Sequence, residues 1–402
     1  MPGTGDSVVE YGPSDIGSAE FEAANAERVI DAVSAGAVAL GSLPHLRDPG
    51  DFIAAVPAIL GFMPERSLVV TVLRATPEQP SIATVDVVAR IDLDDPGRAA
   101  TAEIVERVAG ICVRNTASAV LALIIDDRAT PPGDRQRGVR ARRHRDLVGA
   151  LEHRLDAAAL PLAGAWAVNT IGVDMPWWSV CEPVRRGRQP DPAASLVTLR
   201  QVLEGRPLRA SRAELAESVA VDRVLRDRVR AALPAATAAA SQRLARAVRR
   251  GEPDAHTREE LRKVLRQLVN IEAGACLDGG ELAELAGALR ATAVRDILFG
   301  LMPGRHADAA EALWLRLTRA LPDPDRAEAA MLLGYAAYVR GDGPLAGVAL
   351  ETALASDPGH RLAALLDIGL QTGMHPHRLN KLAAAGREAA ADLGIALDSE
   401  QP

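Results

Sequence analysis

Residues 333–358 read LGYAAYVRGDGPLAGVALETALASDP, and this stretch predicts two helices that pack side by side. Gly334 lies on the first helix, where the missing side chain lets the second helix approach closely. Gly341 lies where the first helix ends, because glycine readily adopts the left-handed conformation that terminates helices. The small Ala346 lies at the crossing of the two helices, and Pro358 stops the second one. The stretch therefore predicts a helical carboxyl-terminal half.

This hairpin resembles the helical hairpins of tetratricopeptide repeats. The resemblance is carried by residues at the helix ends and at the contact between the helices, namely Leu333–Gly334, Gly341, Ala346, Ala353–Leu354 and Pro358. Such repeats recur about every 34 residues, and Pro324 precedes Pro358 by that interval. In the earlier interval, however, Arg316 and Arg319 take the places of an apolar and a small residue, so we expect that repeat to be degenerate. The resemblance implies a scaffold that contacts a protein partner or a second copy of the chain.

The composition of the 402 residues is typical of a globular protein with two domains, since 48% are apolar and 25% are charged. Only 3% are aromatic, so stacking of nucleic-acid bases on aromatic side chains is not expected. The net charge of −7 weighs against non-specific binding of nucleic acid by the whole chain. No apolar run approaches the ~20 residues that span a membrane. The three scattered cysteines favour a reducing cytoplasm.

The pattern along the chain predicts a tail and two domains. Residues 1–25, rich in Gly, Ser, Asp and Glu, predict a disordered tail. Residues 26–190 alternate between strand and helix patterns, which predicts an α/β domain with a small mixed sheet. The expected helices of this domain run from Pro49 to just before Gly61 and over 98–115 and 138–160, and its strands over 67–73, 82–93, 119–125 and 162–171. The fold class is therefore a two-part protein that combines α/β and all-α domains.

Residues 191–402 predict an all-helical domain, because strand signals stop after Gln189–Pro192. Ser211 with Glu214, and Thr257 with Glu260, have the spacing of capping boxes at helix starts. Further helices are expected over 261–273, 281–299 and 306–321, followed by the hairpin.

A wider resemblance begins at residues 48–70, which read DPGDFIAAVPAILGFMPERSLVV. This segment resembles the opening of an actinobacterial family known only as domain-of-unknown-function family 4192. Similarity continues through Ile125–Asp127, the two tryptophans of Trp177–Cys181, the helix start Ser211–Leu215 and the closing hairpin. The resemblance implies an intracellular two-part protein and brings no activity. Members commonly carry further cysteines after the tryptophans, but Cys181 has no such companion here, so no metal or disulfide role is carried over.

Two aspartates follow the apolar run 119–125. Asp126 and Asp127 come at the carboxyl end of this strand, where open α/β sheets usually bind ligands. Carboxylate oxygens suit Mg²⁺, so these two residues are candidate metal ligands, and Mg²⁺ is the cofactor that the sequence suggests. Further carboxylates from neighbouring strand ends are Asp92, Asp94 and Asp174. The alternative is that Asp126 and Asp127 simply end a strand and begin a turn.

An arginine run follows the same strand. The candidate ligand-binding residues in it are Arg135, Arg137, Arg140, Arg142 and Arg143. Guanidinium groups near the start of a helix suit phosphate or another polyanion. A glycine-rich phosphate loop is absent from this position, and a solvated basic helix face is the alternative.

No catalytic motif appears in the sequence, so we expect a binding protein rather than an enzyme. Cys112 and Cys276 lie in apolar contexts that predict small core residues. The leading hypothesis is a cytoplasmic interaction or regulatory protein whose helical half binds a protein. The alternative is an α/β domain that binds a metal or phosphate ligand. This alternative includes an enzyme that acts on a phosphorylated substrate. A third hypothesis is binding of nucleic acid through the run Arg135–Arg145.

Overall fold

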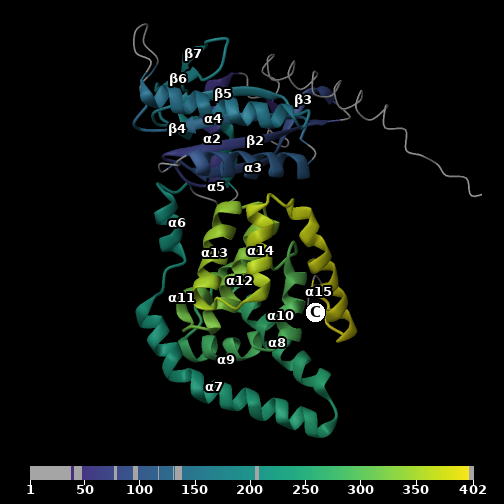
Figure 1. The fold of residues 1–402 in the computed structure, drawn as a ribbon. Helices are drawn as coiled ribbons and strands as arrows, with labels where there is room; N and C mark the ends of the chain where they lie inside the picture. The colour runs from purple at the N-terminus through teal and green to yellow at the C-terminus, as the bar shows by residue number, and fades with distance from the viewer. Residues whose placement is uncertain are drawn as a thin grey trace, which may run out of the picture. The chain divides into compact units, whose positions relative to one another are not determined.

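A computed structural model describes residues 38–39, 48–76, 79–93, 98–115, 117–129, 131, 138–203 and 208–397. Contacts divide the chain into two compact units (Figure 1). The α/β unit comprises Met1–Ala55 and Glu65–Val197, and the helical unit comprises Val56–Pro64 and Thr198–Pro402. The predicted tail, 1–25, lies outside the described residues.

The α/β unit contains a mixed sheet, in which the described residues form seven strands in the order β1-β3-β2-β4-β5-β6-β7. The strands are β1 (Val38–Ala39), β2 (Ser67–Thr76), β3 (Gln79–Asp92), β4 (Ala119–Ile125), β5 (Leu162–Val168), β6 (Pro176–Ser179) and β7 (Arg186–Arg188). Strands β2 and β3 form the predicted antiparallel hairpin. Strand β5 pairs in parallel with β4 after one intervening helix, as the strand–helix–strand pattern predicts.

The three helices of the predicted α/β pattern are α2 (Pro49–Leu60), α3 (Arg98–Arg114) and α4 (Val139–Asp156). Apolar residues of α3 and α4 form one core with alternate residues of β2, β4 and β5. On the other face of the sheet, the ring of Phe52 in α2 packs against Trp166 of β5, with 5.8 Å between ring centroids. Asp48 accepts hydrogen bonds from the backbone of the first turn of α2, and Gly61 ends the helix with φ +71°. Both ends of α2 are therefore as predicted.

The paired tryptophans lie on β6, which sequence patterning did not identify as a strand. Trp178 belongs to the core beneath α3 and α4. Trp177 is also buried, and its indole lies so close to Gly187 of β7 that a Cβ there would meet Nε1 at 2.6 Å. Both rings therefore pack within the fold of the α/β unit.

The helical unit is built from α5 (Leu196–Leu203), whose first two residues belong to the α/β unit, and ten further helices in the described residues. These are α6 (Arg212–Ser218), α7 (Arg223–Arg250), α8 (Pro253–Glu272), α9 (Gly279–Leu289), α10 (Thr292–Leu298), α11 (Ala307–Ala320), α12 (Asp325–Val339), α13 (Gly343–Ser356), α14 (Arg361–Gln371) and α15 (Asn380–Asp392). Among the described helices, none is both long and apolar enough to cross a membrane.

The helices α12 and α13 form the hairpin that the sequence predicts. A Cβ on Gly334 would lie 2.8 Å from Cγ of Leu350 on the facing helix, so this position requires glycine for the close approach. Gly341 ends α12 with φ +84°, and Ala346 and Ala353 are fully buried. Most of α12 is buried, and it contacts α11, α13 and α14 (Figure 1).

Some helix ends differ from the sequence-based expectations. The predicted start at Thr257–Glu260 is wrong, because α8 already begins at Pro253, which the first turn of a helix tolerates well. The helix predicted over 281–299 is interrupted at Arg290, whose guanidinium is held by both carboxylate oxygens of Asp325 at 2.7 Å.

The two predicted core cysteines have different environments. Cys112 is in the core, where burial raises the pKa of its thiol to about 12. Cys276 is exposed in the loop before α9, so its predicted burial is wrong. The apolar residues around Cys276 in the sequence suggested a helix, but α8 ends before it.

Candidate functional site

The carboxyl end of β4 carries the first candidate site, in the α/β unit. Asp126 follows β4 directly, and its side chain is only 2% exposed. Its carboxylate accepts from Arg128 Nε at 2.7 Å and lies 3.1 Å from His144 Nε2 of α4. Arg140, one turn earlier on α4, lies 3.5 Å from the same carboxylate. Asp126 thus joins β4 to α4 through a buried cluster of polar side chains.

The protonation states in this cluster follow from burial and hydrogen bonding. Burial raises the pKa of Asp126, but the hydrogen bonds from Arg128 and His144 outweigh burial and hold that pKa below its usual value. Burial lowers the pKa of His144 and outweighs the opposite effect of Asp126. A carboxylate can only accept, so a neutral His144 donates its Nε2 proton to Asp126.

The second aspartate is engaged by a different arginine. Asp127 accepts two hydrogen bonds from Arg66, with Nε to Oδ1 at 2.9 Å and Nη2 to Oδ2 at 3.1 Å. The two aspartates therefore face guanidinium groups, and a cation at Asp126 and Asp127 has to displace them. No group of three His, Cys, Asp or Glu side chains with metal-binding geometry occurs among the described residues. The magnesium site at Asp126 and Asp127 stays a prediction.

The other predicted residues are dispersed. Arg142 and Arg143 are exposed on α4, while Arg135 and Arg137 lie outside the described residues. Asp92 pairs with Arg90 of the same strand, and Asp174 pairs with Arg188 at 3.0 Å; Asp94 is not among the described residues. The structure therefore brings Arg140, but neither Asp92 nor Asp174, to Asp126.

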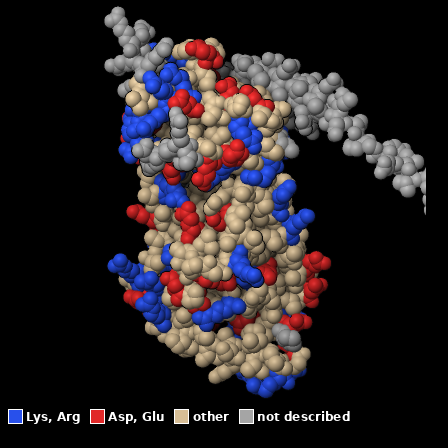
Figure 2. Space-filling model, in the orientation of Figure 1, with Lys and Arg blue, Asp and Glu red and all other residues tan. Residues whose placement is uncertain are grey.

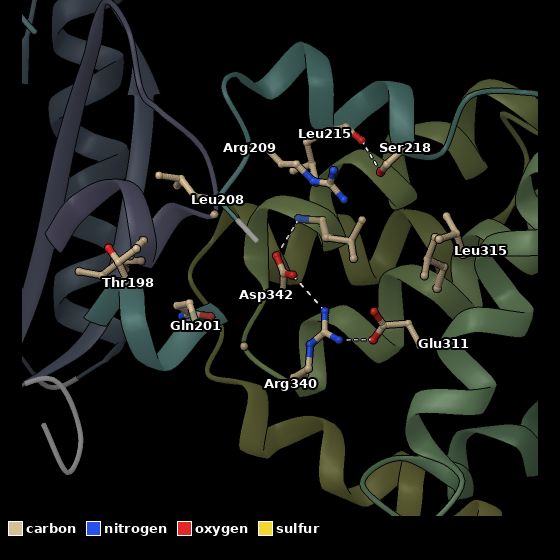
Figure 3. A pocket seen from close by; sticks show the side chains of 16 residues that line it. Thr198, Gln201, Leu208, Arg209, Leu215, Ser218, Glu311, Leu315, Arg340 and Asp342 are labelled. Carbon is tan, nitrogen blue, oxygen red and sulfur yellow. Dashed lines mark hydrogen bonds and ion pairs between the residues drawn. The ribbon is translucent and has the colours of Figure 1, made fainter. Parts of the chain in front are cut away.

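A pocket of about 280 Å³ lies in the helical unit (Figure 3). It is formed by the end of α2, α5, the segment before α6, α6, α11, and the α12–α13 hairpin. Its lining combines apolar residues with charged and polar ones, which are Thr198, Gln201, Arg209, Ser218, Glu311, Arg340 and Asp342. Residues distant in the sequence thus meet around one cavity.

The backbone fixes Arg209 at this pocket. Arg209 donates its N–H to the carbonyl of Gly61 at 2.9 Å, and its own carbonyl accepts from Met63 N at 3.1 Å. Its guanidinium lies 3.7 Å from Glu214, which is beyond hydrogen-bond length. Figure 3 shows the Arg209 side chain among the residues that line the cavity. Arg209 therefore forms an ion pair with Glu214 but no hydrogen bond to it.

The other cation of the pocket, Arg340, faces both acidic residues of the lining, Glu311 and Asp342. Arg340 donates to Glu311 at 2.6 Å and to Asp342 at 3.0 Å, as the dashed lines in Figure 3 mark. Asp342 also caps α13 by accepting from Leu345 N at 3.1 Å. Burial raises the pKa of Glu311, and the guanidinium of Arg340 opposes that rise. Because Arg340 is matched by two carboxylates, Arg209 is the pocket cation best placed to receive an anionic ligand.

The sequence did not predict this pocket. Arg340, Gly341 and Asp342 belong to the predicted hairpin, but the hairpin pattern indicates only where the first helix ends. Arg209 has no sequence signal beyond its position shortly before the cap at Ser211.

A family model described as "Domain of unknown function (DUF4192)" matches residues 49–377. The match includes α2, the described sheet from β2 onward, and the helical unit through α14. No curated protein and no solved structure matches this chain.

Proposed function

The chain belongs to the DUF4192 family of unknown function, and we propose that its helical unit is a binding module that captures a carboxylate-bearing segment of a partner protein. The observation that carries this proposal is Arg209, a cation that lines a built pocket and whose ion pair with Glu214, at 3.7 Å, is longer than a hydrogen bond. A guanidinium that receives a carboxylate forms two parallel hydrogen bonds, which gives both affinity and orientation.

The size and lining of the pocket favour an amino-acid-sized group. Small-molecule sites usually enclose about 300–1,000 Å³, and this pocket has about 280 Å³. Leu208, Leu315 and Leu345 supply apolar surface beside the charges. An aliphatic residue with a free carboxylate, at the end of a chain or on a side chain, satisfies both parts of the lining.

Two further features suit this module to contacts with proteins inside the cell. We take the α12–α13 hairpin as tetratricopeptide-like, which suits a scaffold for protein contacts. Cys112, Cys181 and Cys276 are unpaired, which suits a reducing cytoplasm. In this proposal the protein acts by recognition, as an interaction or regulatory partner.

The test is a thermal-shift screen of the full chain with N-acetyl amino acids, each as the free acid and as the amide. A ligand that binds the folded state raises the unfolding temperature. We expect at least one aliphatic free acid to raise it and the matching amide to have no effect. Acetyl-aspartate and acetyl-glutamate amides test for a side-chain carboxylate as the ligand.

The matched variants are Arg209→Gln and Arg212→Gln. Arg212 is three residues away and pairs with Glu351 at 2.5 Å, but it does not line the pocket. We expect Arg209→Gln to abolish the stabilisation by the acid and Arg212→Gln to retain it. Equal stabilisation of both variants, or none of the wild type by any acid, would contradict the proposal.

A further inference from the structure

Helix α7 is the most basic element of the helical unit. Of its 28 residues, eight are arginine and one, Asp227, is acidic. The arginines are Arg223, Arg226, Arg228, Arg230, Arg243, Arg246, Arg249 and Arg250. Nine of the other 20 residues are alanine, and none is aromatic. A helix of this composition has a strongly positive local field although the whole chain is acidic.

Most of these arginines face solvent. Only Val229 of α7 is buried, and six of the eight arginines are exposed. Arg230 lies 3.6 Å from Asp227, whereas no carboxylate in the described part of the chain pairs with Arg223, Arg228, Arg246, Arg249 or Arg250. Figure 2 shows blue side chains at both ends of the place where Figure 1 draws α7. The two ends of α7 therefore carry unneutralised positive charge.

The arginines at the beginning of α7 are repelled by the dipole of the helix. The amino end of a helix carries partial positive charge, so cations there are unfavourable. Arg223, Arg226 and Arg228 nevertheless occupy the first two turns, and no acidic residue lies in the first turn. The cap residue Asp222 offsets part of this repulsion by accepting from Leu225 N at 3.0 Å. The amino end of α7 therefore carries more positive charge than its own dipole favours.

The spacing of the two basic ends indicates what kind of anion fits. Arg228 and Arg246 are 18 residues apart, which is five full turns and about 27 Å measured along the helix. Pro234 lies between them, and Figure 1 draws α7 as a curved helix. Between the two ends, the exposed residues include Ala231, Pro234 and Ala238. An anion that reaches from one basic end to the other must be a long polymer, and about 27 Å corresponds to roughly eight base pairs of a duplex at 3.4 Å each.

We infer that the exposed side of α7 binds the phosphate backbone of duplex DNA. Guanidinium groups form paired hydrogen bonds with phosphate, and contacts to the backbone carry no base sequence. A single strand is a poorer fit, because stacking of unpaired bases needs aromatic side chains that α7 lacks. DNA bound in this way is recognised by charge, without preference for a base sequence.

The packing of α7 holds its carboxyl-terminal half in place for this role. Arg243 is turned toward α8, where it donates to Glu260 at 2.9 Å. Lys263 of α8 donates to the same oxygen at 2.9 Å. The exposed Arg246, Arg249 and Arg250 lie beyond this anchor. One arginine of α7 thus serves the fold, while its neighbours remain available to a ligand.

The experiment measures binding of the full chain to a 30-base-pair fluorescent duplex by anisotropy, over a series of salt concentrations. The test variant carries Arg246→Gln, Arg249→Gln and Arg250→Gln. A second variant, which tests the competing site, carries Arg142→Gln, Arg143→Gln and Arg145→Gln on α4, where the sequence suggested binding of nucleic acid. Circular dichroism verifies that both variants fold.

Each lost phosphate contact lowers the slope of log K against log salt by about 0.9. We therefore expect the α7 variant to reduce the slope by about 2–3, and the α4 variant to leave it unchanged. Absence of duplex binding by the wild type at low salt overturns the inference. A loss confined to the α4 variant also overturns it and assigns binding to α4. Tenfold tighter binding of duplex RNA, or binding only to vesicles of anionic lipid, overturns the choice of DNA.

Discussion

Helices α4 and α7 are both long and arginine-rich, and both expose several arginines, yet they differ in how their first arginines meet acidic residues. In α4, Arg140 and His144 meet the buried Asp126, and Arg154 donates to Glu106 of α3 at 2.8 Å. In α7, five of the eight arginines have no carboxylate partner among the residues that the structure describes, and Arg243 is held by the buried Glu260. The difference shows that a run of arginines gains its role from the acidic residues on neighbouring elements, even where these are distant in the sequence.

Among the substitutions that test this comparison, Asp126→Ala is expected to lower the stability of the fold the most. The substitution leaves His144 and part of Arg128 buried without their acceptor, which costs about 3–5 kcal/mol in comparable buried pairs. We expect a loss of stability of about 3 kcal/mol, because Arg128 is partly exposed. Urea unfolding followed by circular dichroism measures it.

The control for this prediction is Asp127→Ala. Asp127 and Arg66 are both about half exposed, so water screens their interaction and we expect a much smaller loss of stability. Similar losses in the two variants would show that the buried contacts of Asp126 stabilise the fold no more than the exposed pair of Asp127 does.

The second effect is that of Glu260→Ala, which breaks the anchor of α7. The Glu260 side chain is 1% exposed and accepts from both Arg243 and Lys263. Its other oxygen, Oε2, has no partner, so the substitution also removes an unfavourable buried atom. We expect a loss of about 2 kcal/mol, in the range for hydrogen bonds to charged groups. The neighbouring Glu259→Ala serves as control, since Glu259 is more than half exposed, and an equal loss there argues against a specific anchor.

The third effect is a dependence of the stability of the fold on pH, which arises from His144 of α4 and has no counterpart in α7. Because burial lowers the pKa of His144 in the folded state, the unfolded chain takes up its proton first as the pH falls. The stability that the neutral His144 contributes is fully present above its ordinary pKa of 6.5, and it is lost as the pH falls below that value. The opposing Asp126 keeps the effect moderate.

Unfolding titrations between pH 7.5 and 5 compare the wild type with His144→Gln. We expect the variant to be less stable at pH 7.5, with a smaller further loss toward pH 5. The lowered pKa of Asp126 acts only at lower pH, below its ordinary value of 3.8, so the two groups are separable. Parallel pH profiles of the two proteins would exclude His144 as the source.

The smallest effect on stability is that of the double variant Arg249→Gln, Arg250→Gln. Both side chains are exposed, and substitutions at such positions usually change stability by less than about 0.5 kcal/mol. Their place in the last turn adds a favourable interaction with the helix dipole of about 0.3–1 kcal/mol. We therefore expect a total loss below about 1 kcal/mol in urea unfolding. A larger loss means that these arginines contact the fold and are not free for a ligand.

Sequence reasoning was most successful where the structure is determined by nearby residues. Strand β4 coincides with its apolar run 119–125, and Gly334 and Gly341 have the roles that the hairpin spacing predicts. In these cases, burial of a continuous apolar strand or a close helix contact leaves few alternatives to the local pattern.

The same reasoning failed where distant residues decide the outcome. Thr257 and Glu260 have the spacing of a capping box, yet Glu260 is the buried partner of Arg243 within α8. The pocket joins Arg209 to Glu311 and Arg340, which only the folded chain brings together. The exposed alanines of α7 give little periodic signal, so the helix and its two basic ends were not recognised as one element.

The division of the chain has a consequence for biosynthesis. Residues Val56–Pro64 belong to the helical unit but precede most of the α/β unit, so 65–197 form an insertion within it. On the ribosome this short segment emerges well before Arg209, whose backbone forms hydrogen bonds with Gly61 and Met63. The helical unit therefore cannot be completed until the inserted unit has been synthesised, and a fragment that begins at Thr198 lacks one wall of the Arg209 pocket.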